Sequence, residues 1–258
     1  MLPTTLKEIA NYIVADGKGI LAADESTGTI EKRFKSIDVE STEENRRKYR
    51  EMLFRSSAMT EAIGGVILFD ETLRQNAADG TPLREVILSQ KSLPGIKVDQ
   101  GVQPFNGSDT EKTTQGLDGL NERCKEYDNL GAKFTKWRAV INIGDGIPTD
   151  KCIDANMDAL ANYAKCAQDN GMVPIVEPEV LMDGDHNIDE CYQATEKSLK
   201  SLFNHLEKKG VNIKGTLLKP NMVTSGKDNS NQASIDEVAK KTLDCLIKNV
   251  PAELPILV

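Results

Sequence analysis

The sequence has 258 residues, of which 39% are hydrophobic and 28% are charged, and its formal net charge is −8. This length and composition are typical of a soluble globular protein with one large domain or two small ones. The acidic balance, with lysine and arginine scattered along the chain, argues against nucleic acid or an anionic membrane surface as the main partner.

The remaining composition excludes several other classes of protein. The five cysteines contain no C-x-x-C pair, and the amino terminus lacks the basic and apolar segments of a secretory signal. The longest run of apolar residues and glycines, 62–69, is far below the roughly 18 residues that a membrane helix needs. The stretch DGDH at 183–186 resembles a metal loop, but the chain has only one other histidine, so we interpret it as a loop and helix cap. We therefore expect a reduced, cytoplasmic protein without a metal or a cofactor.

Helical and strand patterns alternate from the amino terminus onwards. Leu2, Leu6, Ile9 and Ile13 recur at helical spacing, which predicts an amphipathic helix that ends near Gly17. Apolar strands follow, each ahead of an amphipathic helix, at residues 19–24, 64–70, 95–99, 134–141, 173–180 and 215–223. A seventh strand begins at residues 254–258, the last of the sequence.

Two connections in this pattern are longer than the others. After the first strand, a polar loop leads to a helix that is expected to begin with a capping box of Ser41 and Glu44. After the third strand there is a second polar loop, residues 102–114. Neither has the composition of a linker between domains, so residues 1–258 are expected to form a single domain.

Charged residues at the strand ends distinguish between two sheet topologies. Alternating buried strands and helices predict a parallel sheet, either doubly wound or closed into a barrel. Five charges lie within or just after apolar strands, at about forty residues per strand–helix unit: Asp24, Lys97, Lys136, Glu177 and Lys219. They would meet at one end of a barrel, whereas a doubly wound sheet concentrates its chemistry near one or two strands. The sequence therefore favours a TIM (β/α)8 barrel, with six units and the start of strand seven.

Lys219 poses a chemical question because it lies in the apolar stretch GTLLKPNMV, where an ammonium must be paired or neutralised. Desolvation and a second ammonium nearby, which Lys136 could supply, lower the pKa of a buried lysine. The resulting free amine attacks carbonyls to form a Schiff base. Glu177 could shuttle the protons, and Glu179, on the same face of the strand, could balance charge or hold the shuttle. Asp24 could serve as a second acid–base group.

Each of these residues also has a purely structural interpretation. A lysine in a strand is commonly an edge residue or half of an ion pair. Glu177 and Glu179 could pair with the two lysines, and Asp24 could cap the loop that follows it. The repetition of the charges at unit spacing is the observation that favours a common site.

Several segments closely resemble class I fructose-bisphosphate aldolases, in the same order and over essentially the whole chain. They are GKGILAADESTGTIEKRF, TEENRRKYREMLF, GVILFDETL, GIKVDQGV, TTQGLDGLNERCKEY, GAKFTKWRAV, VPIVEPEVLMDGDH and GTLLKPNMVT. The resemblance implies a metal-independent lyase of glycolysis and gluconeogenesis. It would cleave fructose 1,6-bisphosphate reversibly to dihydroxyacetone phosphate and glyceraldehyde 3-phosphate through a Schiff base. Transaldolase-like and deoxyribose-phosphate aldolase-like barrels share the lysine chemistry but do not match ADESTG and KPNMVT.

The resemblance also implies a role for each candidate residue. Lys219 would form the imine, and Glu177 would transfer protons with Lys136 and Glu179 beside it. Asp24 would accept the hydroxyl proton that starts carbon–carbon cleavage. Phosphate and hydroxyl groups of the substrate would bind at Ser26, Arg33, Lys97 and Arg138. The family implies a homotetramer, and actin as a partner of some members.

The end of the sequence departs from the family pattern. Family members continue past PILV into the rest of strand seven, a serine–glycine phosphate loop, an eighth strand with a phosphate-binding arginine, and a C-terminal tail. The chain is therefore expected to be a C-terminally truncated form that keeps the imine chemistry but has low stability and little activity alone. An inactive fragment or a non-catalytic scaffold with the aldolase fold is the alternative.

Overall fold

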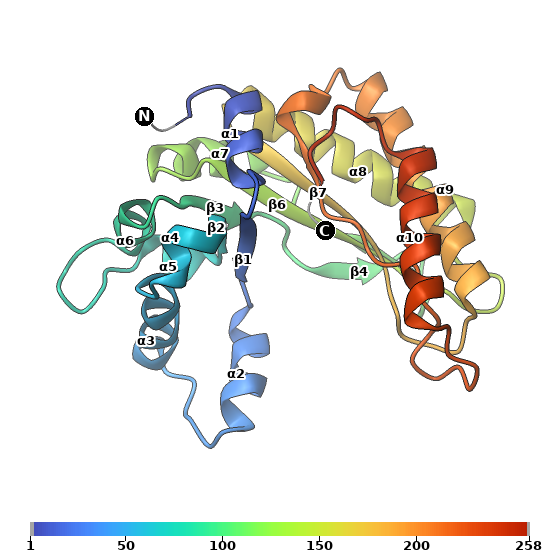
Figure 1. The fold of residues 1–258 in the computed structure, drawn as a ribbon, viewed down its shortest axis with the longest axis horizontal. Coiled ribbons are helices and arrows are strands. Elements are labelled where there is room, and N and C mark those ends of the chain that lie inside the picture. The colour runs from blue at the N-terminus through green and yellow to red at the C-terminus, as the bar shows by residue number, and fades with distance from the viewer. Residues whose placement is uncertain (1–2, 257–258) are drawn as a thin grey trace.

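The computed structural model describes residues 3–256, and at its centre lies a curved parallel sheet of six strands (Figure 1). In chain order these are β1 (Gly19–Ala23), β2 (Ile63–Leu68), β3 (Leu93–Lys97), β6 (Phe134–Ile141), β7 (Val173–Val180) and β8 (Leu217–Leu218). They lie side by side in the same order, without the reversal that marks a doubly wound sheet. The described residues form a half-barrel with β1 and β8 at its edges, so the prediction of an incomplete α/β barrel is confirmed.

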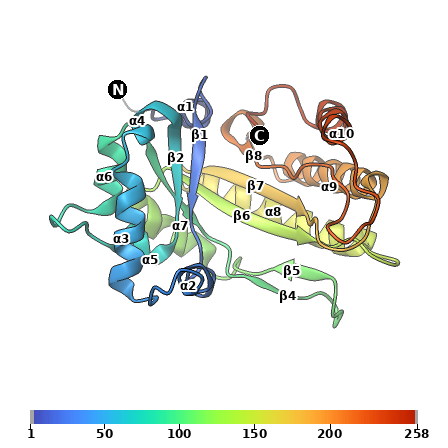
Figure 2. The same ribbon diagram turned by 60° about the horizontal axis from the view of Figure 1, so that its bottom comes forward.

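Helices cover the outer face of the half-barrel, as Figure 2 shows for its two arms. One arm carries α3 (Glu43–Phe54), α4 (Ala58–Ala62), α5 (Asp70–Arg74), α6 (Leu83–Ser89) and α7 (Leu120–Asn129). The other carries α8 (Asp150–Asp169), α9 (Ile188–Lys208) and α10 (Ile235–Asn249), with the short 3-10 turn η1 (Ile213–Gly215) ahead of β8. The main hydrophobic core lies between sheet and helices and includes the fully buried Phe54, Trp137 and Tyr163. This burial positions the strand ends that carry the charged residues.

Helix α1 (Leu6–Ile13) packs against the end of the sheet that lies opposite the charged strand ends. Ile9 and Ile13 pack into a second, smaller core that is built from the inner faces of the strands. A Cβ atom on Gly64 would lie 2.2 Å from the carbonyl oxygen of Ile13, so only glycine permits this approach. The predicted helix also included Leu2, which lies outside the described residues.

Two segments that were expected to be loops contain regular structure. Helix α2 (Thr27–Lys35) follows β1 and buries only Ile30 and Phe34, one turn apart. The polar segment after β3 contains an antiparallel hairpin of β4 (Val102–Pro104) and β5 (Lys112–Thr114). Both elements are short and mostly exposed, so they lack the apolar pattern that reveals a core element.

The predicted capping box of Ser41 and Glu44 is wrong. Thr42 is the N-cap residue of α3, and its hydroxyl accepts a hydrogen bond from the Asn45 amide at 3.1 Å. The carbonyl of Ser41 accepts a hydrogen bond from Arg46 Nη1 at 2.7 Å instead. Two adjacent hydroxyl residues offer the helix alternative caps, and this contact of Ser41 leaves Thr42 as the cap.

The last complete strand is shorter than predicted. Only two of residues 215–223 belong to β8, and Pro220 has no amide to extend the ladder. Leu218 forms a parallel bridge with Ile256, which is consistent with the expected start of another strand. Residues 257–258 of that predicted strand lie outside the described residues.

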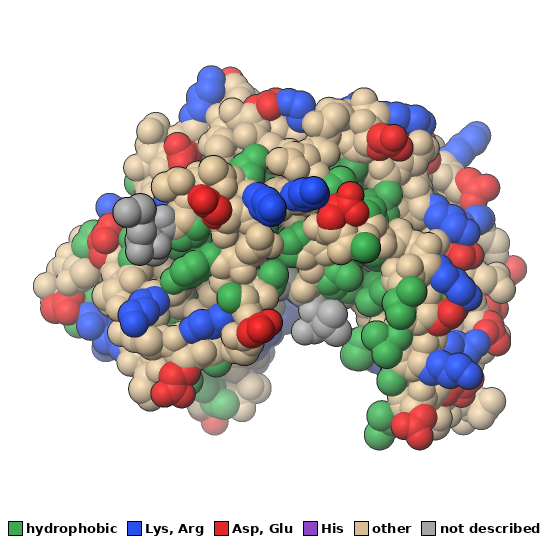
Figure 3. All heavy atoms as spheres, turned by 45° about the horizontal axis from the view of Figure 1, so that its top comes forward, with side chains coloured by type: hydrophobic (Ala, Val, Ile, Leu, Met, Phe, Trp, Pro, Cys, Tyr) green, Lys and Arg blue, Asp and Glu red, His purple; other side chains and the backbone are tan. Residues whose placement is uncertain are grey.

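Figure 3 shows hydrophobic side chains at the surface around a hollow between the two arms. On α10, the side chains of Ile235, Leu243 and Ile247 are exposed. Within residues 3–256, no helix combines the length and the apolar character needed to cross a bilayer.

Candidate active site

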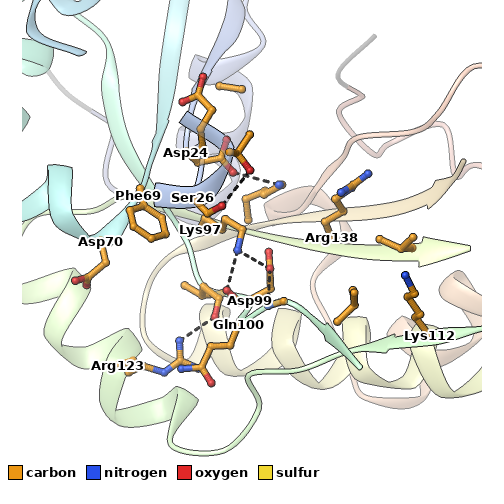
Figure 4. Close-up of a pocket in the computed structure, with 18 of the residues that line it drawn as sticks. Asp24, Ser26, Phe69, Asp70, Lys97, Asp99, Gln100, Lys112, Arg123 and Arg138 are labelled. Atoms are coloured by element: carbon orange, nitrogen blue, oxygen red, sulfur yellow. Dashed lines mark hydrogen bonds and ion pairs between the residues drawn. The ribbon is translucent and has the colours of Figure 1, made fainter. Parts of the chain in front are cut away.

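A cavity of about 1050 Å³ lies at the carboxyl ends of the strands (Figure 4). Its lining comes from the ends of β1, β3 and β6, from α2 and α5, and from the β4–β5 hairpin. Six of the predicted site residues line it: Asp24, Ser26, Arg33, Lys97, Lys136 and Arg138. The other three, Glu177, Glu179 and Lys219, are not in the lining and connect to it through salt bridges.

Four charged side chains of alternating sign form a continuous chain at this end of the half-barrel. Lys136 Nζ lies 3.2 Å from Asp24 Oδ2 and 3.0 Å from Glu177 Oε2. The other carboxylate oxygen of Glu177 forms a salt bridge with Lys219 Nζ. The four residues come from the loop after β1, from β6, from β7 and from the end of β8, so the parallel sheet brings together groups that are distant in the sequence.

Lys136 is an enclosed cation whose side chain is only 9% exposed. Burial lowers its pKa, but the carboxylates of Glu177, Asp24 and Asp99 together raise the pKa above the ordinary lysine value. Lys136 is therefore an ammonium that holds two carboxylates in place. Lys136 is thus the lysine of the pair that stays a cation, because the nearby carboxylates have a larger effect on its pKa than burial does.

Glu177 is the shared partner of the two lysines. Its side chain is 4% exposed, and it extends from β7 between them. The contact of its Oε2 with Lys136 is at ion-pair distance but is not aligned as a hydrogen bond. The Oε2 atom of Glu177 thus accepts no hydrogen bond, although it lies in a nearly dry site, and it can receive a proton.

Lys219 lies in a more open environment than the apolar run predicted. Its side chain is 39% exposed, although the backbone on either side of it was expected to be a buried strand. The reason is that β8 is an edge strand among the described residues, so a neighbouring strand flanks it mainly on the β7 side. The salt bridge with Glu177 is the contact that holds the amine at the site.

Two further ion pairs border the cavity. Arg138 lies two residues after Lys136 and on the same face of β6, as strand alternation predicts, and it forms a salt bridge with Glu179. Burial lowers the pKa of Arg138, but its hydrogen bond to Glu179 and nearby carboxylates raise it overall. Lys97 donates to Asp99 Oδ1 at 2.6 Å and to the Asp99 carbonyl at 2.9 Å. Lys97 therefore lines the same cavity without joining the four-residue chain.

The loop after β1 carries Ser26 and Arg33 to the cavity. Ser26 is the N-cap residue of α2, but its hydroxyl lies 3.0 Å from the Thr29 hydroxyl and caps no helix amide. Arg33 is exposed and forms a salt bridge with Glu25. The fully buried Arg50 donates a hydrogen bond to the Glu25 carbonyl at 2.7 Å. The hydrogen bond from Arg50 therefore fixes the backbone of this loop, while the side chains of Ser26 and Arg33 remain available to a ligand.

Several lining residues were absent from the prediction: Asp70, Asp99, Lys112 and Arg123. Asp70 and Asp99 close the apolar stretches of their strands, and the rule that identified Asp24 would also have found them. Lys112 lies on the unpredicted hairpin and Arg123 on a helix, so nothing in the local sequence placed them at the site.

Metal binding has no obvious location in this part of the chain. Among residues 3–256, no group of three or more His, Cys, Asp or Glu side chains is arranged to hold a metal ion. The DGDH stretch lies in the loop before α9, whose N-cap is Asn187. His186 in that stretch is buried, and its ring nitrogens have no hydrogen-bond partner.

The arrangement is suited to chemistry between an amine and a carbonyl. A lysine in contact with a buried carboxylate can release its proton, attack a carbonyl and recover the proton later. A second carboxylate, Asp24, lies across Lys136 and can accept a proton from a substrate hydroxyl. The surrounding lysines and arginines favour an anionic substrate.

Comparison with known proteins gives matches along nearly the whole chain. The sequence profile described as "Glycolytic: Fructose-bisphosphate aldolase class-I" matches residues 5–258. The chain is 54% identical over 253 residues to a probable fructose-bisphosphate aldolase class 1 of Xanthomonas campestris pv. campestris, and the match covers 98% of this chain and 76% of that protein. It is 50% identical over 256 residues to "Fructose-bisphosphate aldolase 4, cytosolic" of Arabidopsis thaliana, with coverage of 98% and 65%.

A solved structure agrees with the sequence matches. Fructose-bisphosphate aldolase from Plasmodium falciparum, in complex with TRAP and a small-molecule inhibitor, superposes with a TM-score of 0.95 at 46% sequence identity. The superposition covers 97% of this chain and 73% of that chain. The half-barrel and the strand ends that carry the site therefore have counterparts in a solved aldolase.

Proposed function

Because the chain belongs to the class I fructose-bisphosphate aldolase family, a family of glycolytic lyases, we propose that its catalytic amine is the side chain of Lys219. The reaction of the family is the reversible cleavage of fructose 1,6-bisphosphate to dihydroxyacetone phosphate and glyceraldehyde 3-phosphate. The contact between Lys219 and the buried Glu177 is the observation that carries the assignment. It pairs a nucleophile with a proton acceptor beside the cavity.

Imine formation follows from this pair. Lys219 passes a proton to Glu177, and the free amine adds to the C2 carbonyl of the open-chain sugar, forming a carbon–nitrogen bond. The carbonyl oxygen takes up the second amine proton, which gives a carbinolamine. Glu177 then returns its proton to that hydroxyl, which leaves as water, and the nitrogen lone pair forms the C=N bond of a cationic imine. Protons balance, and Glu177 ends as a carboxylate.

Cleavage uses the second carboxylate. Asp24 accepts the proton of the C4 hydroxyl, the C3–C4 bond breaks, and its electron pair moves to the imine nitrogen to give an enamine. C4 becomes the aldehyde carbon of glyceraldehyde 3-phosphate, which departs. The proton held by Asp24 returns to C3, water adds to C2, and dihydroxyacetone phosphate is released, which leaves Asp24 as a carboxylate and Lys219 as an ammonium. Lys136, as a fixed ammonium between Asp24 and Glu177, stabilises each carboxylate when it is ionised.

Phosphate and hydroxyl groups of the sugar have candidate partners in the cavity lining. Arg33, Lys97 and Arg138 supply cationic donors, and Ser26 supplies a hydroxyl that caps no helix amide. Charge-assisted hydrogen bonds from such groups are the usual means of holding a phosphate. Glu179 holds Arg138 in place through its salt bridge.

Reductive trapping tests this proposal. The protein is incubated with dihydroxyacetone phosphate, reduced with borohydride and mapped by peptide mass spectrometry. One reduced adduct on Lys219 is expected in the wild type and in Lys214→Ala, which removes a nearby exposed lysine, and no adduct in Lys219→Ala. An adduct on another lysine, or none on a folded wild-type sample, would contradict the assignment. The second result would favour a non-catalytic scaffold.

Other aspects of the function remain predictions of the same proposal. The protein is expected to work in the cytoplasm without a metal or a cofactor, and the name of the Arabidopsis relative, cytosolic, supports that location. Cleavage that persists after exhaustive chelation would support metal independence. Light scattering tests the expected homotetramer, and co-sedimentation with filaments tests the expected contact with actin.

A further inference from the structure

The β4–β5 hairpin brings Lys112 to the cavity, and no step of the reaction above uses this residue. Figure 2 shows the hairpin alongside β6, near the carboxyl ends of β6 and β7. Lys112 lines the cavity together with Arg138, Val140 and Asn142, which lie at alternate positions along β6 and just beyond its end. The hairpin thus adds a cation to the part of the cavity beyond Arg138.

The backbone at Lys112 is fixed from two sides. Its carbonyl accepts a hydrogen bond from Asn156 Nδ2 of α8 at 2.8 Å. The hydroxyl of Thr114, two residues later, donates to the carbonyl of Arg138 on β6 at 2.7 Å. A lysine on a fixed base loses less conformational freedom on binding a ligand than one on a loose loop.

The direction of the side chain follows from strand alternation. Lys112 and Thr114 lie on the same face of β5, and Thr114 contacts β6, so Lys112 also points towards β6 and the cavity. Figure 4 shows its amine directed back towards the part of the cavity that holds Arg138. The residue is half-buried, so a ligand there would be only partly screened by water.

Charge pairing sets Lys112 apart from the other cations of the cavity. Arg33, Arg74, Lys97, Lys136 and Arg138 each form a salt bridge, and Arg123 donates to two backbone carbonyls. Among residues 3–256, each of the other lysines and arginines in the lining has a carboxylate or carbonyl partner, whereas Lys112 has neither. Its charge is not neutralised within the protein and is available to an anionic group.

The position of the cavity indicates which end of the substrate would meet Lys112. Asp24 lines the cavity and Lys219 does not, so the cavity extends from Asp24 away from the amine. In the proposed reaction C2 is bound to Lys219 and the C4 hydroxyl faces Asp24. The remaining carbons and the C6 phosphate therefore extend into the cavity, one side of which carries Arg138 and Lys112.

We propose that Lys112 binds the C6 phosphate and thereby makes the enzyme selective for ketose 1,6-bisphosphates over ketose 1-phosphates. The assignment of C6 rests on the proposed function, because the imine at Lys219 sets the direction of the sugar. A half-buried ammonium facing a dianionic phosphate contributes about five- to tenfold in affinity. Lys112 is a specificity residue, since it acts on a phosphate that is remote from the breaking bond.

Two measurements test this proposal in Lys112→Met, Lys112→Arg and a control variant, Lys151→Met. Lys151 is an exposed lysine at the start of α8, outside the cavity. The first is the dissociation constant of hexitol 1,6-bisphosphate, which has both phosphates but no carbonyl and so binds without forming an imine. The second is the half-saturating concentration of fructose 1,6-bisphosphate and of fructose 1-phosphate in the borohydride trapping reaction.

Lys112→Met is expected to weaken hexitol bisphosphate binding about five- to tenfold and to raise the half-saturating concentration of the bisphosphate by the same factor. In Lys112→Met, the half-saturating concentration of fructose 1-phosphate should stay within about twofold of the wild-type value. Lys112→Arg and Lys151→Met should stay within about twofold of the wild type in both measurements. Unchanged hexitol bisphosphate binding in Lys112→Met, or an equal loss for both ketoses, would overturn the proposal. Weaker hexitol bisphosphate binding without any adduct on Lys219 would instead retain phosphate binding at Lys112 and reject the proposed imine.

Discussion

Replacement of Lys136 by methionine is expected to destabilise the folded protein by about 3 kcal/mol. The side chain is 9% exposed, and its Nζ lies 3.0 Å from one carboxylate and 3.2 Å from another. Methionine has a similar length and no charge, so packing is largely kept while the cation is lost. Asp24 and Glu177, with side chains 13% and 4% exposed, would then face each other without the ammonium between them.

The size of the effect follows from the geometry. Two unit charges about 3 Å apart attract by about 5 kcal/mol at an effective dielectric constant of about 20, and two such pairs offset the desolvation of Lys136. Removing one partner of a buried pair costs about 3–5 kcal/mol because the remaining charge is left uncompensated. We expect the lower end of this range, since Lys219 still neutralises Glu177 in the variant.

The pH dependence of this effect has a definite sign. The pKa of Lys136 is raised in the folded state, so from neutral pH up to the ordinary lysine pKa of about 10.4 its ion pairs stabilise the protein fully. The contribution is lost only as the pH rises through the higher folded value. The stability difference between wild type and Lys136→Met should therefore be constant from about pH 7 to about pH 9 and should shrink in more alkaline solution.

Urea denaturation followed by circular dichroism measures this difference. The control is Lys133→Met, which removes a side chain that is 39% exposed and 4.0 Å from its partner Asp128, and it should change stability by less than about 0.5 kcal/mol. A loss below about 1 kcal/mol in a folded Lys136→Met variant would refute the reasoning, because the two carboxylates would then be stable without their shared cation.

Two other substitutions separate chemistry from packing. Glu177→Gln keeps the shape of the side chain but removes the proton acceptor, so imine formation should slow about 100-fold or more in timed borohydride trapping, and an unchanged rate would place the proton shuttle elsewhere. Gly95→Ala would place a Cβ atom 2.3 Å from ring atoms of Phe134 and should lower stability in urea by about 2 kcal/mol or more. Gly28→Ala, where nothing lies within 4 Å, is the matched control, and an equal loss there would exclude the clash as the cause.

The order of the strands and the convergence of their charges were predictable from local sequence. Each strand of a parallel sheet is buried on both faces, so a charge within or directly after such a strand has few positions to occupy other than the end of the sheet. Lys136 lies within β6 and Glu177 within β7, and both are buried side chains that meet in an ion pair. The prediction of a shared site depended on the repetition of such charges from strand to strand, because a single charged residue in one strand would not have revealed the site.

The environment of Lys219 could not be predicted in the same way. The apolar run around it indicated a buried strand, but the exposure of a residue on a strand also depends on which strands flank it. β8 has two residues and lies at an edge of the described sheet, so the amine is more open than its neighbours suggest. The local sequence likewise could not show which carboxylates lie near Lys136, because the three that raise its pKa come from other parts of the chain and approach it only in the tertiary structure.

The hairpin and α2 were missed because their stability comes from contacts distant in sequence. The hairpin strands have three residues each, and their anchors are Asn156 on α8 and the carbonyl of Arg138 on β6. Helix α2 buries Ile30 and Phe34, which do recur at helical spacing, but its other residues are polar. The residues that complete the cavity, Lys112 among them, lie on such segments, so sequence patterns located the strand ends more readily than the substrate contacts.

These differences change the physical account of how the amine would act as a nucleophile in the proposed reaction. Burial together with a neighbouring ammonium was expected to leave Lys219 neutral, but the structure shows a half-exposed amine in contact with a buried carboxylate. In that arrangement the position of one proton, on Lys219 or on Glu177, decides whether the amine can attack. Lys136 and Asp24 can then influence the proposed reaction through Glu177, since the ammonium of Lys136 contacts both carboxylates. The alternating charges therefore hold both carboxylates beside Lys136, and in the proposed reaction a substrate carbonyl that reaches Lys219 meets an amine in direct contact with a proton acceptor.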